Sequence, residues 1–247
     1  NEDDMKKLYK QMVQELEKAR DRMEKLYKEM VELIQKAIEL MRKIFQEVKQ
    51  EVEKAIEEMK KLYDEAKKKI EQMIQQIKQG GDKQKMEELL KRAKEEMKKV
   101  KDKMEKLLEK LKQIMQEAKQ KMEKLLKQLK EEMKKMKEKM EKLLKEMKQR
   151  MEEVKKKMDG DDELLEKIKK NIDDLKKIAE DLIKKAEENI KEAKKIAEQL
   201  VKRAKQLIEK AKQVAEELIK KILQLIEKAK EIAEKVLKGL EHHHHHH

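Results

Sequence analysis

Apolar residues recur every 18 positions through most of the chain. In the middle third, one slot of this repeat holds Met86, Met104, Met122, Met140 and Met158. The same step relates Leu164, Leu182, Leu200, Leu218 and Val236 in the last third, and Tyr9, Tyr27, Phe45 and Tyr63 in the first. Eighteen residues make five turns of an α-helix at about 3.6 residues per turn, so the apolar stripe stays on one side. The repeat therefore predicts long, straight, untwisted helices.

Glycine marks the breaks between these helices. The chain has four glycines and no proline, and its two internal breaks read Gly80-Gly81-Asp82 and Asp159-Gly160-Asp161. Glycine lets a helix end through a left-handed residue, and aspartate accepts hydrogen bonds from the free N–H groups of the next helix. Each break therefore has the composition of a short turn between two helices.

These breaks predict three helices, which cover about residues 4–79, 83–158 and 162–238. Asp3 and Asp4 would cap the first helix, and Gly239 would follow the last. Turns of so few residues cannot carry the chain back along a helix roughly 110 to 120 Å long, so consecutive helices must be antiparallel. The expected fold is all-α: one straight, up-down-up three-helix rod over residues 1–241. The third helix would bury the same stripe on either side of the first hairpin, so the pattern does not predict the handedness of the bundle.

Residues of unequal size are expected to share each layer of the core. Counting from the two turns places Phe45 level with Ala118 and Ala204, which pairs a large side chain with small ones. Asn171 and Asn189 interrupt the stripe of the third helix. They would lie either buried, as markers of helix register, or at the solvated margin of the stripe. Four apolar residues lie just outside the stripes, where they would either thicken the core or form an exposed patch: Leu33, Leu40, Ile114 and Leu223.

The chain carries a net charge of +13, concentrated on the middle helix. Residues 83–158 contain 28 basic and 16 acidic side chains. This excess would allow at most weak, nonspecific binding of nucleic acid or anionic lipid, because lysine greatly outnumbers arginine and stacking aromatic residues are nearly absent. We expect a solvated face that serves solubility.

No catalytic, cofactor-binding or metal-binding residues are predicted. Cysteine and serine are absent, and histidine occurs only at 242–247, which is typical of a purification tag. Met133, Met136 and Met140 are spaced as a thioether copper site could be, but their stripe favours core packing. The sequence around Gly160 lacks the spaced ligands of a calcium loop, which favours helix capping. We expect no enzyme activity.

Targeting segments are not expected either. The N-terminal residues are acidic where a signal peptide is basic, and no apolar run exceeds two residues, which excludes a transmembrane span. These features are typical of a soluble protein obtained by recombinant cytoplasmic expression.

The sustained repeat and the Gly-Asp turns resemble those of parametrically designed, monomeric, antiparallel three-helix bundles. The resemblance covers everything before the tag and implies an engineered, hyperstable scaffold without a natural activity or natural partners. The alternative is an amphipathic binding protein for anionic membrane surfaces or lipid, although such proteins usually carry proline and interfacial aromatic residues. A natural spectrin-like or tropomyosin-like spacer is disfavoured by the regular step.

Overall fold

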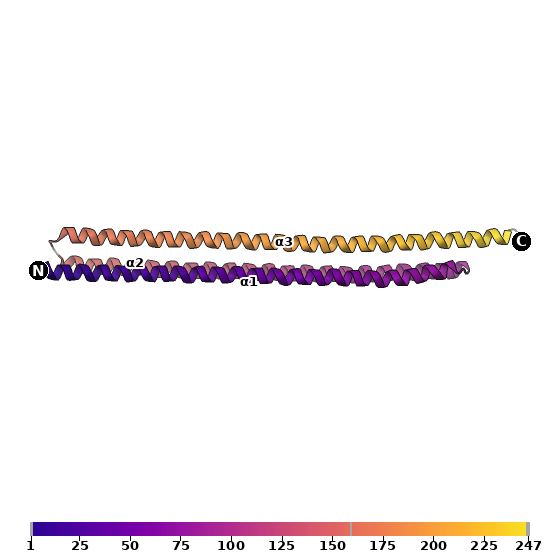
Figure 1. Ribbon diagram of the computed structural model, residues 1–247, viewed down its shortest axis with the longest axis horizontal. Helices are drawn as coiled ribbons and strands as arrows, with labels where there is room; N and C mark the ends of the chain where they lie inside the picture. Colours follow the sequence, from indigo (N-terminus) through magenta and orange to yellow (C-terminus); the bar gives the residue numbers. More distant parts are fainter. Residues whose placement is uncertain (1, 159, 246–247) are drawn as a thin grey trace. The chain divides into compact units, whose positions relative to one another are not determined.

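The computed structural model describes the backbone of residues 2–158 and 160–245, and side chains as far as residue 240. These residues form three α-helices, α1 (Glu2–Lys78), α2 (Lys83–Lys157) and α3 (Asp162–His245), as Figure 1 shows. The described residues contain no strand, so the expected all-α, three-helix class is confirmed. Asn1, Asp159, His246 and His247 lie outside the described part.

Aspartate caps two of the helices, as the sequence predicts. Asp82 Oδ1 accepts a hydrogen bond from the backbone N–H of Lys85 at 2.9 Å, and Asp161 Oδ1 accepts one from Leu164 at 3.4 Å. Each bond satisfies an N–H group that has no carbonyl partner within its helix. The expected cap at Asp3 and Asp4 is wrong, because α1 begins at Glu2 and both side chains lie within its first turn. Acidic residues also stabilise a first turn by interacting with the helix dipole.

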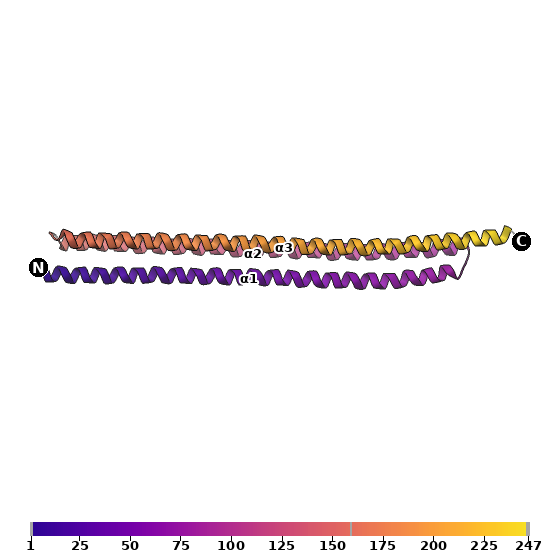
Figure 2. The same ribbon diagram turned by 45° about the horizontal axis from the view of Figure 1, so that its top comes forward.

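The turn that joins α1 to α2 depends on glycine geometry (Figure 2). Gly80 has a φ of 91°, and its N–H donates to the carbonyl of Ile77 at 3.1 Å, which closes the end of α1. Gly160 has a φ of 101° in the second turn. Gly239, by contrast, does not have a positive φ and does not end α3, which continues to His245 rather than stopping near 238. Glycine permits a helix exit but does not impose one.

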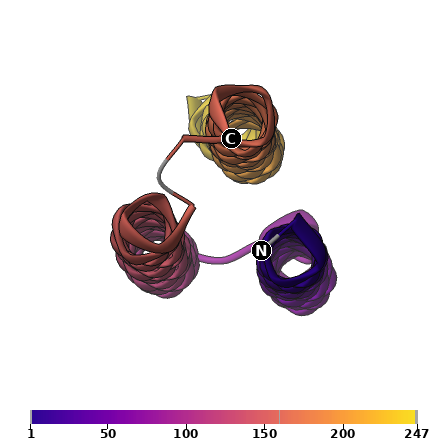
Figure 3. The same cartoon turned by 90° about the vertical axis from the view of Figure 1, so that its left-hand side faces the viewer.

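The chain divides into two compact units, each built from a part of every helix. Unit 1 comprises the described residues up to Lys43 together with Gln120–Leu200. Its three helical segments form a triangle when viewed along their length (Figure 3). Its core draws on all three, with Met23 and Met30 from α1, Met140 from α2, and Ile168 and Ala186 from α3.

Unit 2 comprises Ile44–Lys119 and the described residues from Val201 onward. Its core again draws on every helix, and includes Met59 and Ile70 of α1, Met104 of α2, and Ile222 and Ala229 of α3. No polar or charged side chain is buried among the residues whose burial is described. The cores of both units are therefore entirely apolar.

Side-chain size differs systematically between the helices. None of the buried methionines lies on α3: all are on α1 or α2 except Met158, which directly follows α2, whereas nine buried alanines lie on α3. The alanines of α3 leave the space that the long methionine side chains fill, and methionine adapts to an irregular gap more readily than branched residues do. Phe45 follows the same rule: it is buried in unit 2, as are Ala118 and Ala204.

Replacement of Phe45 by alanine should lower the free energy of unfolding by about 3 to 5 kcal/mol, because the ring is buried and a cavity would remain. Guanidinium-induced unfolding followed by circular dichroism measures the change. Phe45→Leu is the matched control and should cost less than about 1.5 kcal/mol, since it preserves most of the apolar volume. Equal stability of Phe45→Ala and the parent chain would show that the ring contributes no packing.

Replacement of Gly80 by alanine should destabilise the protein by about 1 to 2 kcal/mol, because a Cβ disfavours positive φ even where nothing blocks it. A Cβ at Gly80 would meet no atom within 4 Å, so the cost is purely conformational. Gly239→Ala is the control: its site is helical and equally open, and it should leave stability unchanged or slightly raised. Chemical denaturation of both variants checks this, and an unchanged Gly80→Ala would contradict the argument.

Candidate functional site

The described residues offer no cluster for metal binding or acid–base catalysis. No group of three or more histidine, cysteine, aspartate or glutamate side chains is placed to hold a metal ion within this part of the chain. The remaining candidate features are the charged contacts and grooves on the surface.

Arg150 of α2 forms ion pairs with two glutamates. Its Nε donates to Glu15 Oε2 of α1 at 3.0 Å, and its Nη1 donates to Glu153 Oε2 at 3.0 Å. The hydrogen bond to Glu15, and then that to Glu153, raise the pKa of Arg150 above its ordinary value. Arg150 therefore stays protonated throughout the physiological range and links α1 to α2, without acting as an acid or base.

A second interhelical ion pair joins Lys69 of α1 to Glu96 of α2. Lys69 Nζ lies 3.8 Å from Glu96 Oε1, and Lys99 Nζ approaches the same oxygen at 4.0 Å. Exposed pairs of this kind contribute at most about 1 kcal/mol each. The two interhelical pairs share one register of α1 against α2, because the residue numbers 15 with 150 and 69 with 96 both add up to 165.

That spacing gives a structural context for two of the apolar residues outside the stripes. Steps of 18 residues from the two ion pairs reach Leu33 with Glu132, and Glu51 with Ile114. Leu33 and Glu132 line the same small hollow, so they do face each other across α1 and α2 of unit 1. Leu33 is 39% exposed, whereas Ile114 is half-buried. The two ion pairs thus lie at the ends of this series of four, and the two apolar and acidic pairs lie between them.

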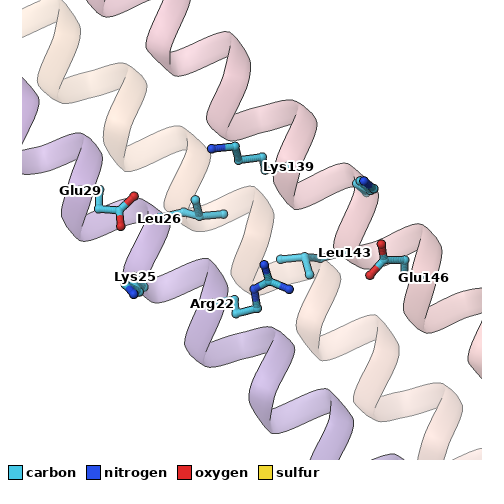
Figure 4. A pocket seen from close by; sticks show the side chains of 8 residues that line it. Arg22, Lys25, Leu26, Glu29, Lys139, Leu143 and Glu146 are labelled. Carbon is cyan, nitrogen blue, oxygen red and sulfur yellow. The ribbon is translucent and has the colours of Figure 1, made fainter.

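A groove of about 430 Å³ lies between α1 and α2 of unit 1 (Figure 4). Its lining comprises two leucines, four basic and two acidic side chains: Arg22, Lys25, Leu26, Glu29, Lys139, Lys142, Leu143 and Glu146. Leu143 is buried and Leu26 is half-buried, while the six charged residues are exposed. The groove has an apolar floor under charged walls.

Two other hollows are comparable in kind. One of about 400 Å³ lies between α2 and α3 of unit 1, where three lysines and three glutamates balance each other. Another of about 180 Å³ in unit 2 contains Phe45, and the guanidinium carbon of Arg203 lies 4.7 Å from the centre of that ring. This arrangement is a cation–π contact between α1 and α3. None of these hollows brings a nucleophile next to a base.

The structure places the remaining residues that the sequence singles out. Met133, Met136 and Met140 are buried in the core of unit 1, where they pack rather than form an exposed thioether site. Asn171 and Asn189 are both half-buried, which fits the margin of the stripe rather than its centre. Leu40 and Leu223 are each 46% exposed. Asp161 caps α3, as described above.

The groove and the Arg150 contact were not predicted from the sequence. On each helix alone, their charged residues have the pattern of ordinary surface positions. Only the constant sum of the numbers of facing residues on α1 and α2 could have predicted which of them meet. No helix in the described part is long and apolar enough to cross a membrane.

Of the comparisons with known proteins, the one with solved structures gives a match. No family model and no curated protein matches the chain. A solved structure described as a computationally designed three helix bundle matches with a TM-score of 0.91 and 99% sequence identity. The match covers 93% of this chain and 99% of that one. At this identity the two chains differ at very few positions, so they agree in sequence as well as in fold.

Proposed function

The chain belongs to the computationally designed three-helix bundles, and we propose that it is a structural scaffold without a natural biochemical role. It has no natural enzymatic activity. The observation that supports this role most directly is the 99% identity to a designed bundle. The core agrees with it, because every buried side chain among those described is apolar and none is set aside for chemistry.

We further propose that residues 1–241 form one straight, untwisted, up-down-up bundle, followed by the tag at 242–247. Three observations support this. Each helix is continuous through both units. The interhelical ion pairs join rising numbers on α1 to falling numbers on α2, as antiparallel neighbours do. The 18-residue repeat has no drift that would wind the helices around one another.

The bundle is proposed to be monomeric and unusually stable, and to be produced recombinantly. Local helix propensity, the apolar pattern and the turn residues all favour the same fold, which is the condition for a stable, unique structure. Natural partners are not proposed. The excess charge of α2 supports only weak, salt-sensitive contacts with nucleic acid or anionic lipid.

Small-angle X-ray scattering with an absolute mass tests the proposed assembly. Tag-cleaved protein should give a monomer mass and a maximum dimension near 120 Å, the length of one helix of this size at about 1.5 Å per residue. The measurement should agree at two protein concentrations. A doubled mass, or a dimension near twice this value, would contradict a monomeric bundle and point to lateral association or to exchanged helices.

Flotation with vesicles tests the scaffold against the lipid-binding alternative. Vesicles that mix neutral and anionic phospholipid should recover little protein at about 0.15 M salt, because charge contacts of exposed lysines are screened at this ionic strength. Recovery should rise only at low salt and should vanish with neutral vesicles alone. Strong binding at physiological salt with retained helical signal would replace the scaffold by a membrane-surface protein.

A further inference from the structure

Three leucines of α1 form a row along the surface of unit 1. Leu26, Leu33 and Leu40 are seven residues apart, and seven residues drift by only about 20° around a helix, so all three share one face. Their exposure increases along the row: Leu26 is half-buried, Leu33 is 39% exposed and Leu40 is 46% exposed. We call these three residues the leucine row.

Leu33 and Leu40, the two more exposed members of the row, are not required by the repeat. One repeat to either side, the slot of Leu33 holds Glu15 and Glu51, and the slot of Leu40 holds Arg22 and Glu58. Charged residues therefore fill the equivalent positions without disturbing the core. Leu26, by contrast, belongs to the apolar stripe, because its equivalents are Leu8, Ile44 and Leu62.

The row borders the groove between α1 and α2. A smaller hollow of about 40 Å³ adjoins this groove and shares Leu26, Glu29 and Lys139 with it. Leu33 lines this smaller hollow, and Met30 and Met136 lie beneath it, both buried. An apolar surface thus runs from Leu143 and Leu26 toward Leu33. We call the two hollows together the leucine groove.

The wide end of the leucine groove has an uncompensated positive charge. Four cations line it, Arg22, Lys25, Lys139 and Lys142, against the two carboxylates of Glu29 and Glu146. None of these six side chains forms an ion pair within 4.0 Å in the described part of the chain. Figure 4 shows Arg22 and Lys139 beside Leu26 and Leu143, so charge and apolar surface lie side by side.

We propose that the leucine groove binds the carboxylate of a single-chain fatty acid. The carboxylate would lie among the four cations, and the alkyl chain would cover Leu26 and Leu33. The distance from Arg22 to Leu33 along α1 is about 16 Å at 1.5 Å per residue, which suits an extended chain of roughly twelve carbons. Such a ligand would remove exposed leucine from water and neutralise the net positive charge of the groove.

Isothermal titration calorimetry with dodecanoate tests the proposal, below the concentration at which this fatty acid forms micelles and at pH 8, where it is ionised. One dodecanoate should bind per chain. Dodecyltrimethylammonium, which carries the same chain with a positive head group, and acetate, which lacks the chain, should both bind at least about tenfold more weakly. Chemical shifts of ¹⁵N-labelled protein should change mainly in α1 and α2 around the groove.

Matched variants separate the groove from the general surface. Leu33→Glu installs the residue found at the equivalent positions and should weaken binding at least about tenfold, while Leu223→Glu on α3 removes an equally large exposed leucine without effect. Lys139→Glu should also weaken binding. Lys121→Glu occupies the same slot one repeat earlier, changes the net charge equally, and should leave affinity within about twofold. Circular dichroism should be the same for all four variants.

Several outcomes would overturn the proposal. Multiple equivalent sites per chain, or equal losses from Lys139→Glu and Lys121→Glu, would reveal nonspecific charge binding. Unchanged affinity of Leu33→Glu would remove the leucine row from the site. Binding to anionic vesicles but not to monomeric dodecanoate would assign the surface to membranes. Only this last outcome would also contradict the proposed scaffold role, so the two proposals fail separately.

Discussion

Packing of long methionine side chains from α1 and α2 against the alanines of α3 is the interaction on which both units depend. Each helix is far longer than the minimum length at which an isolated peptide forms a helix in water. An amphipathic helix nevertheless gains most of its stability only when another helix covers its apolar stripe. Here the stripes are covered without a single buried polar side chain among those described, so no internal hydrogen bond or ion pair has to be satisfied first. The apolar core is therefore the main interaction between the helices of each unit.

Charged residues add specificity to this core rather than much stability. On α1, Glu15 is negative and Lys69 is positive, and each pairs with an opposite charge on α2, Arg150 and Glu96 respectively. A shift of α2 by one repeat would place Glu15 opposite Glu132. Like charges at such a position are unfavourable, and the same shift would replace Ala118 by Val100 or Met136 in its core layer. The surface pairs thereby add to the size differences in the core in favouring one register, which matters most where two chains could exchange helices.

Most of the fold could be predicted because its signals are local and repeated. The 18-residue period predicted the helices, and Gly80, Asp82 and Asp161 predicted the turns and caps that the structure contains. The two errors at helix ends have a common origin. Gly239 and Asp3 have the residue types of helix boundaries, yet such residues also fit inside a helix when nothing else interrupts it.

The sequence by itself determined the helices, the positions of the turns and the apolar face of each helix, because periodicity and backbone preferences act within one segment. Only the tertiary structure decided which surface residues meet. Arg150 and Glu15 are 135 residues apart, and the cations of the leucine groove come from two helices, so no local pattern brings them together. The half-burial of Asn171 and the exposure of Leu33 were decided in the same way, since burial depends on the neighbouring helix rather than on the residue's own slot.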